Sequence, residues 1–168
     1  MTYCVGMLLD AGIVLLSDTR TNAGIDNIST YKKTFVFEDP GERVIAILTA
    51  GSLSVTQTAL ARLEAAVEAP EEEGHRSILK VATMLDAVEL IGETLAQVSS
   101  KVGKKLGAGG GATASMIVAG QRRGGGMRLF LLYPEGNFIE ATADTPYIQI
   151  GENKYGKPIL DRVVTPET

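Results

Sequence analysis

Apolar residues form two short runs at the start of the chain. The first run begins at Tyr3, the second ends near Thr19, and the turn residues Asp10-Ala11-Gly12 lie between them. Runs of this length on either side of turn residues are typical of strands joined as a β-hairpin. Because positions 13–16 are all apolar, the pattern predicts that both faces of the second strand are covered by other layers.

A polar stretch at 22–30 separates this hairpin from two further predicted strands. Apolar runs at 33–38 and 44–49 flank the turn residues at 39–42 and read as a second antiparallel pair. The sequence therefore predicts four strands before any helix.

Helical periodicity begins after Gly51. Apolar residues recur at helical spacing from Ser52, which can serve as the helix cap, to Pro70. A longer amphipathic helix is predicted from Ser77, and its pattern fades toward Gly103. Strands and then a final helix are predicted after the glycine-rich segment, in this order: 113–119, 128–133, 138–141, 147–150 and the helix 155–163.

The order of strands, two helices and strands favours an α+β layered fold over alternating βαβ units. The length of 168 residues suits one domain, so we expect a single domain over 1–168. Thr165-Pro166-Glu167 is typical of a helix start, because it has a capping residue, a proline and an acid in the first turn. We therefore expect native sequence to continue beyond Thr168.

Composition narrows the class of protein. The chain is 45% hydrophobic and has a net charge of -4 with dispersed lysines and arginines, which argues against a nucleic-acid partner. Asp10 and Asp18 interrupt the apolar runs well before the roughly 20 residues that a membrane span needs. The only cysteine, Cys4, allows no disulfide within the chain and favours a reducing compartment. These features predict a soluble cytoplasmic protein.

Thr2 is the first candidate for chemistry. A threonine hydroxyl is a weak nucleophile without a base, but an N-terminal threonine carries a base in its own α-amine. Removal of Met1 would expose this amine. The predicted hairpin brings Asp18 back beside the chain start, so a carboxylate lies within reach of Thr2.

Two more residues follow at places where strands begin or end. Strand alternation directs Lys32 and Lys33 to opposite faces, so one ammonium at most can favour deprotonation of the threonine hydroxyl. Gly51 lies where a strand passes into a helix, and its N–H could bind an oxyanion. The glycine-rich segment 107–111 lacks the Gly-Lys-Ser/Thr ending of a phosphate loop, and His75 has no second ligand at metal-binding spacing.

The order and spacing of these features resemble the β-subunits of proteasomes. Within that superfamily the chain is most similar to the Anbu family, the bacterial ancestral β-subunits. Three segments carry this closer resemblance: Thr2-Tyr3-Cys4-Val5-Gly6, Ser17-Asp18-Thr19-Arg20-Thr21-Asn22-Ala23-Gly24 and Gly151-Glu152-Asn153-Lys154-Tyr155-Gly156.

The resemblance implies a four-layer αββα sandwich, assembled with identical subunits into a ring or an open helical turn. It implies a threonine-type peptidase or amidohydrolase that acts on peptide or amide bonds without metal or organic cofactor. The implied roles are Thr2 as nucleophile and base, Asp18 and Lys33 as its charge partners, and Gly51 as oxyanion donor. Lys33 is chosen because the family's lysine is the second of such a pair, and Arg20 matches a structural arginine beside the aspartate.

Glu152 departs from the proteasome pattern, which has a serine after the corresponding glycine. It places a carboxylate near the expected site and resembles an Anbu feature. Two alternatives stay open: an HslV-type peptidase that works with a partner ATPase, and a catalytically silent scaffold that keeps the fold for assembly or partner binding.

Overall fold

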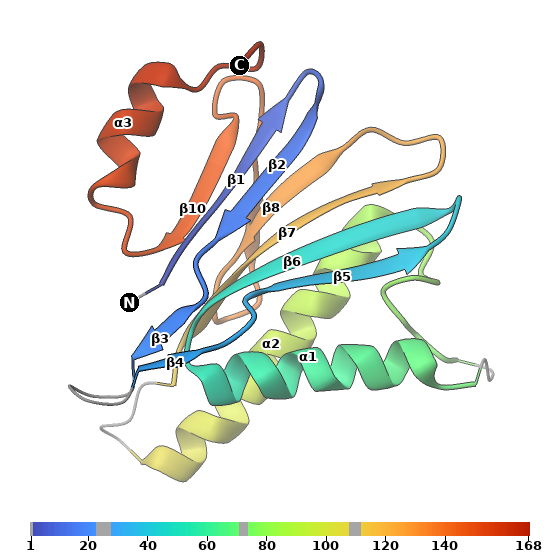
Figure 1. Ribbon diagram of the computed structural model, residues 1–168. Helices are drawn as coiled ribbons and strands as arrows, with labels where there is room; N and C mark the ends of the chain where they lie inside the picture. The colour runs from blue at the N-terminus through green and yellow to red at the C-terminus, as the bar shows by residue number, and fades with distance from the viewer. Residues whose placement is uncertain (1, 23–27, 71–73, 108–111) are drawn as a thin grey trace.

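Two β-sheets packed face to face form the centre of the computed structural model (Figure 1), which describes residues 2–22, 28–70, 74–107 and 112–168. The smaller sheet has the strand order β10-β1-β2 and is antiparallel throughout. Its strands are β1 (Tyr3–Leu9), β2 (Gly12–Ser17) and β10 (Tyr147–Gly151). The predicted opening hairpin is therefore present, and a strand from the far end of the chain lies beside it.

The larger sheet has five antiparallel strands in the order β5-β6-β7-β8-β9. Short turns rich in glycine or proline join β5 to β6 and β7 to β8, which is why neighbours in sequence are neighbours in the sheet. Its strands are β5 (Thr34–Asp39), β6 (Arg43–Gly51), β7 (Ala114–Arg122), β8 (Arg128–Leu132) and β9 (Phe138–Glu140).

An apolar layer fills the space between the two sheets. Gly6 lets them approach closely, because a Cβ at this position would lie 2.9 Å from Leu129 Cδ1 and 3.3 Å from Ile117 Cγ2. The buried members of this layer alternate along their strands, as strand geometry requires. They are Cys4, Leu48, Ala50, Ile117, Ala119, Leu129, Ala141, Ile148 and Ile150.

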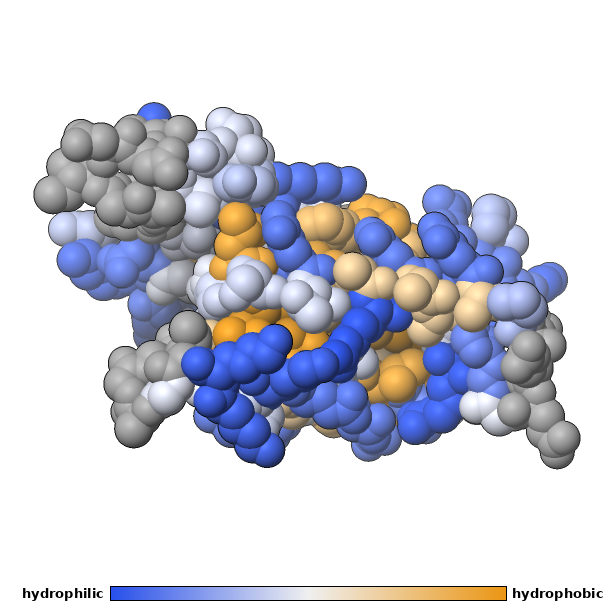
Figure 2. Space-filling model, turned by 90° about the horizontal axis from the view of Figure 1, so that it is seen from below, coloured by the Kyte–Doolittle hydropathy of each residue, from blue (hydrophilic) through white to orange (hydrophobic). Residues whose placement is uncertain are grey.

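Helices α1 (Leu53–Glu68) and α2 (Met84–Leu106) cover the other face of the five-stranded sheet, where they cross obliquely (Figure 1). Their apolar sides pack on the sheet in a second core that includes Ile47, Leu63, Ile91 and Phe130. Seen from below, the outward side of this helix layer is mainly hydrophilic, with apolar atoms visible between the polar side chains (Figure 2). This polarity is typical of amphipathic helices at a protein surface.

Helix α3 (Gly156–Val163) lies on the opposite side of the molecule, beside β10 (Figure 1). Tyr147 on β10 donates a hydrogen bond to Asp161, and Lys157 Nζ lies 3.1 Å from the same carboxylate. Helices thus flank the paired sheets on both sides, and the α+β sandwich predicted from the sequence is confirmed. Within the described residues no helix is long and apolar enough to cross a membrane.

Two sequence predictions about α1 and α2 were wrong. Helix α2 begins at Met84, not Ser77, because Thr83 and Asp86 form a reciprocal capping box in which each side chain bonds the other residue's backbone N–H. Ser52 occupies the cap position of α1, but its hydroxyl makes no capping hydrogen bond and lies 3.1 Å from Ser54 Oγ instead.

The sequence did not predict the short hairpin of β3 (Arg20–Asn22) and β4 (Ile28–Thr30), which lies at the two ends of the polar stretch. The residues that join these two strands, and most of the glycine-rich segment, lie outside the described residues. The predicted helix start at Thr165 is a turn, closed by a 3.0 Å hydrogen bond from Thr168 N–H to Thr165 O.

Candidate active site

Thr2 lies directly before β1, at one end of the space between the sheets. Its carbonyl accepts a 2.7 Å hydrogen bond from the Glu152 N–H, and Tyr3 pairs with Gly151 in the β1–β10 ladder. Gly151 has φ +87°, and a Cβ there would overlap Thr2 O. Only glycine lets β10 approach the start of β1 so closely. The backbone of Thr2 is therefore held on the β10 side.

The Lys33 ammonium approaches Thr2 from the other side of β1. The side chain is 6% exposed, and Nζ lies 2.9 Å from Thr2 Oγ1. Nζ also lies 2.9 Å and 3.0 Å from the two oxygens of Asp18, and 2.6 Å from Arg20 O. Asp18 is the carboxylate partner that a buried ammonium requires. The Lys33 ammonium can donate to the threonine oxygen and favour negative charge there.

Asp18 receives hydrogen bonds from three directions. Besides Lys33, the Tyr3 N–H donates to Oδ1 at 2.9 Å and the Arg20 N–H donates to Oδ2 at 3.1 Å. Burial opposes ionisation of this carboxyl group. The hydrogen bonds from Tyr3 and Lys33 and the positive charge of Lys33 outweigh burial and hold the pKa of Asp18 below its usual value.

Strand register explains why these three residues meet. Cys4 pairs with Ser17 in the β1–β2 hairpin, so Asp18, one residue later, lies beside Tyr3. Lys33 immediately precedes β5, and its carbonyl accepts a 3.0 Å hydrogen bond from the Thr49 N–H of β6. The hairpin and the five-stranded sheet therefore each supply one charged partner.

The neighbouring lysine has a different environment. Lys32 is exposed, and its ammonium lies 5.4 Å from the centre of the Phe35 ring. The prediction that Lys32 and Lys33 point in different directions, with Lys33 toward Thr2, agrees with this geometry.

Gly51 ends β6 at the same end of the molecule. It has φ +105°, and a Cβ there would overlap Thr113 O and lie 2.9 Å from Ala114 Cα. A side chain is excluded by both conformation and space. Gly51 also lines a cleft of about 150 Å³, together with Ala50, Thr113, Ala114, Ser115 and Gly151, and the last of these lies against the Thr2 carbonyl.

Arg20 and Glu152 contribute through their backbones. The Arg20 N–H binds Asp18 and its carbonyl accepts from Lys33, whereas its exposed guanidinium makes no hydrogen bond within the described part of the chain. Glu152 binds Thr2 through its N–H, and its side chain is exposed. Sequence reasoning named both residues but could not identify these main-chain roles, because any residue type carries the same groups.

Sequence reasoning missed the donors and acceptors around the charged pair. The Tyr3 amide was not among the candidates, nor was the 2.8 Å hydrogen bond between the hydroxyls of Ser17 and Thr34. Alternation along β2 could have indicated the second contact, because Ser17 shares a face with the buried-side residues Ile13 and Leu15.

Cys4 lies next to the site but does not share its polarity. The thiol is fully buried, and Sγ lies 3.6 Å from Thr49 O. Burial, and to a lesser extent Asp18, raises its pKa to about 12, so it stays a neutral thiol. No cluster of three or more potential metal ligands occurs among the described residues.

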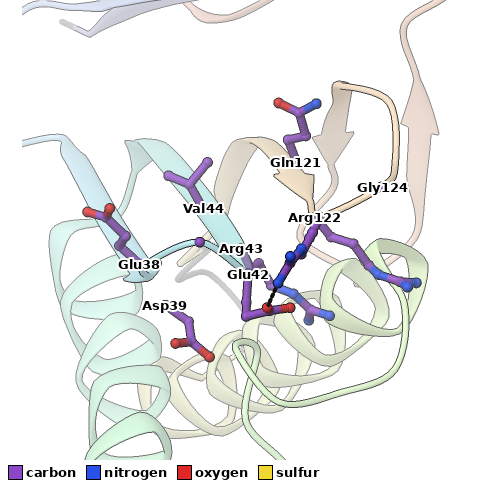
Figure 3. Close-up of a pocket in the computed structure, with 10 residues that line it drawn as sticks. Glu38, Asp39, Glu42, Arg43, Val44, Gln121, Arg122 and Gly124 are labelled. Atoms are coloured by element: carbon purple, nitrogen blue, oxygen red, sulfur yellow. Dashed lines mark hydrogen bonds and ion pairs between the residues drawn. The ribbon is translucent and has the colours of Figure 1, made fainter.

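A second hollow, of about 270 Å³, lies at the other end of the five-stranded sheet (Figure 3). It is lined by the β5–β6 turn and the end of β7, and its charged residues include Glu38, Glu42, Arg43 and Arg122. Figure 3 shows acidic and basic side chains facing each other across it. None of these residues contacts the group around Thr2.

Comparison with known proteins gives matches among solved structures. Anbu from Yersinia bercovieri is 44% identical, with a TM-score of 0.89, over 99% of this chain and 67% of that chain. The structure described as a helical assembly of the Anbu complex from Pseudomonas aeruginosa is also 44% identical, with a TM-score of 0.90 and the same coverage. This chain belongs to the Anbu family. No family model and no curated protein matches it.

An Anbu mutant (Gly-1) from Hyphomicrobium sp. strain MC1 is 42% identical, with a TM-score of 0.89, over all of this chain and 68% of that one. The chain thus spans about two thirds of the length of these Anbu structures. The family assignment predicted from the three sequence segments is confirmed, as is the proteasome-like fold.

Proposed function

We propose that this Anbu-family chain is an N-terminal threonine hydrolase that cleaves peptide or amide bonds. The observation that carries the proposal is the position of Lys33 Nζ, which is 2.9 Å from Thr2 Oγ1 and also bonded to both oxygens of Asp18. A hydroxyl beside a buried, carboxylate-paired ammonium is set up for deprotonation at lower cost than a hydroxyl in water.

Acylation begins after removal of Met1. The freed α-amine of Thr2 accepts the proton from Oγ1, and Oγ1 attacks the carbonyl carbon of the substrate. The Lys33 ammonium stabilises the negative charge on Oγ1, and the Gly51 N–H binds the oxyanion that forms on the substrate. The C–N bond then breaks, and the leaving amine takes the proton back from the α-ammonium.

Deacylation uses water as the second nucleophile. Water attacks the ester carbon while the α-amine accepts one of its protons, and the ester C–O bond breaks. Thr2 Oγ1 regains a proton and the carboxylic acid leaves. None of these steps calls for a metal or an organic cofactor.

The environment of the reaction follows from two features. The Pseudomonas structure is described as a helical assembly, and the 44% identity supports self-assembly of this chain with identical subunits in a related way. A single buried cysteine fits a reducing compartment, so we place the protein in the cytoplasm.

The test compares wild type with Thr2→Ala and Thr2→Ser in the full-length protein. An epoxyketone or boronate probe directed at N-terminal threonine should label wild type, and also Thr2→Ser more slowly, but not Thr2→Ala. Equal labelling of wild type and Thr2→Ala would overturn the nucleophile assignment. Quantitative retention of Met1 in native protein would favour a catalytically silent scaffold.

A further inference from the structure

A hydroxyl interrupts the apolar layer between the sheets at the end nearest Thr2. Ser115 on β7 lies directly opposite Ala50 of β6, and it alternates with Ala114 and Met116, which face the helices. Ser115 therefore shares its face with Ala50, Ile117 and Ala119, all members of the inter-sheet core. The packing of this apolar face does not require a polar side chain at position 115.

Ser115 has a free hydroxyl. The residue is half-buried, and its side chain makes no hydrogen bond to another described residue. It lines the cleft of about 150 Å³ together with Gly51 and Gly151. Ser115 Oγ keeps some contact with solvent, so its hydrogen-bond partner can be a molecule that enters the cleft.

The position of the cleft identifies that partner. Gly51 supplies the proposed oxyanion donor on one wall, and Gly151 on another contacts the carbonyl of Thr2. Lys33 and Asp18 fill the β2 side of Thr2, so the β10 side is the open approach to an acyl group on Oγ1. The cleft has room for more than one water, and its other walls carry only small side chains.

We propose that Ser115 holds the water that hydrolyses the acyl-enzyme, which rests on the proposed threonine mechanism. The water donates one O–H to Ser115 Oγ and the other to the α-amine of Thr2, and its lone pair attacks the ester carbon. The α-amine takes that proton, the ester C–O bond breaks, and Thr2 Oγ1 is reprotonated as the acid leaves. Ser115 loses no proton and acts as a positioning residue.

The experiment separates acylation from deacylation in the assembled, Met1-processed protein. With an activated ester of a short peptide, acylation is fast, so wild type should show a burst of leaving group followed by slower turnover. Ser115→Ala should keep the burst and lose roughly tenfold in the slow phase, the effect of one hydrogen bond. Added hydroxylamine, which can attack without Ser115, should restore turnover of this variant.

Two further variants serve as controls. Ser99 Oγ on α2 also lacks a hydrogen-bond partner in the described structure, although it is fully buried, so Ser99→Ala should leave both phases unchanged. Ser115→Thr keeps the hydroxyl and should retain the slow phase. A slow phase unaffected by Ser115→Ala, or slowed without rescue by hydroxylamine, would overturn the role of Ser115. A wild type that does not turn over the ester at all would instead overturn the proposed function itself.

Discussion

Lys33 and Arg43 are both buried cations of the five-stranded sheet region, but they lie at opposite ends of it and bind different groups. Lys33 is 5% exposed and Arg43 is 8% exposed. The Lys33 ammonium is bonded to a carboxylate and to a threonine hydroxyl. The Arg43 guanidinium donates to two main-chain carbonyls, those of Ile78 at 2.8 Å and Val81 at 2.6 Å.

The difference shows what each cation does. Arg43 anchors the segment between the helices through the main-chain carbonyls of Ile78 and Val81. Burial and the nearby positive charge of Arg122 lower the pKa of Arg43, which nevertheless stays charged as arginines do in proteins. Lys33 instead points at an atom that can react. The burial of a charged side chain is therefore not sufficient to identify a reactive site. The groups that the side chain binds distinguish a reactive site from a structural anchor.

Replacement of Lys33 tests the first half of this comparison and should have the largest effect. Lys33→Met removes the charge beside Thr2 Oγ1, so turnover and probe labelling should fall about 100-fold or more, as for loss of a preorganised electrostatic contact. Arg43→Met should react with the probe at the wild-type rate below its unfolding temperature. Equal losses in the two variants would mean that Lys33 is only structural.

Replacement of Arg43 tests the second half. Arg43→Met leaves two buried carbonyls without donors, so the free energy of unfolding should fall by about 1–3 kcal/mol in urea titrations. The matched control is Arg123→Met, which removes an exposed ion pair with Glu42. This variant should change the free energy of unfolding by about 0.5 kcal/mol or less. An Arg43 variant as stable as this control would contradict the anchoring role.

Acid should dissociate the site network in a defined pH range. The pKa of Asp18 is lower in the folded than in the unfolded chain, so its ionised form adds stability above the unfolded pKa of about 3.9. That contribution should disappear as pH falls through the lower, folded pKa. Urea titrations from pH 7 downward should show wild type and Asp18→Asn converging in stability at the acid end. A difference in stability between the two proteins that stays constant with pH would exclude ionised Asp18 as the source of the stabilisation.

The smallest effect concerns Cys4, which is buried beside the same network. Because burial raises its pKa to about 12, the thiol should resist iodoacetamide in folded protein at pH 8 and react only after unfolding. Mass spectrometry before and after addition of urea measures this. Rapid modification of the folded protein would mean that the space between the sheets opens at this end.

The sequence could predict the strands from local patterns, whereas the choice of Lys33 over Lys32 came from the resemblance to proteasome β-subunits. Alternation and turn residues located most strand centres, and the hairpin placed Asp18 beside the chain start. The start of α2 was misplaced because Ile78 is apolar and buried in a non-helical segment, and periodicity cannot distinguish the two cases. The Thr83–Asp86 capping box was the better signal.

Long-range main-chain contacts could not be predicted. The hydrogen bond from Glu152 N–H to Thr2 O joins residues that are far apart in the sequence. The Arg20 carbonyl lies beside Lys33 because of the path of the backbone, not because of the Arg20 side chain. Ser115 is a similar case, because its position beside Gly151 requires the two sheets to be stacked.

The most direct test of the threonine mechanism is intact-mass measurement of the native protein after treatment with an N-terminal-threonine probe. We predict that Met1 is absent, that each chain gains the mass of one probe molecule, and that fragmentation assigns it to Thr2. Lys33→Met should lose Met1 in the same way but gain little or no probe. Retention of Met1 on every chain, or a probe attached anywhere other than Thr2, would contradict the mechanism.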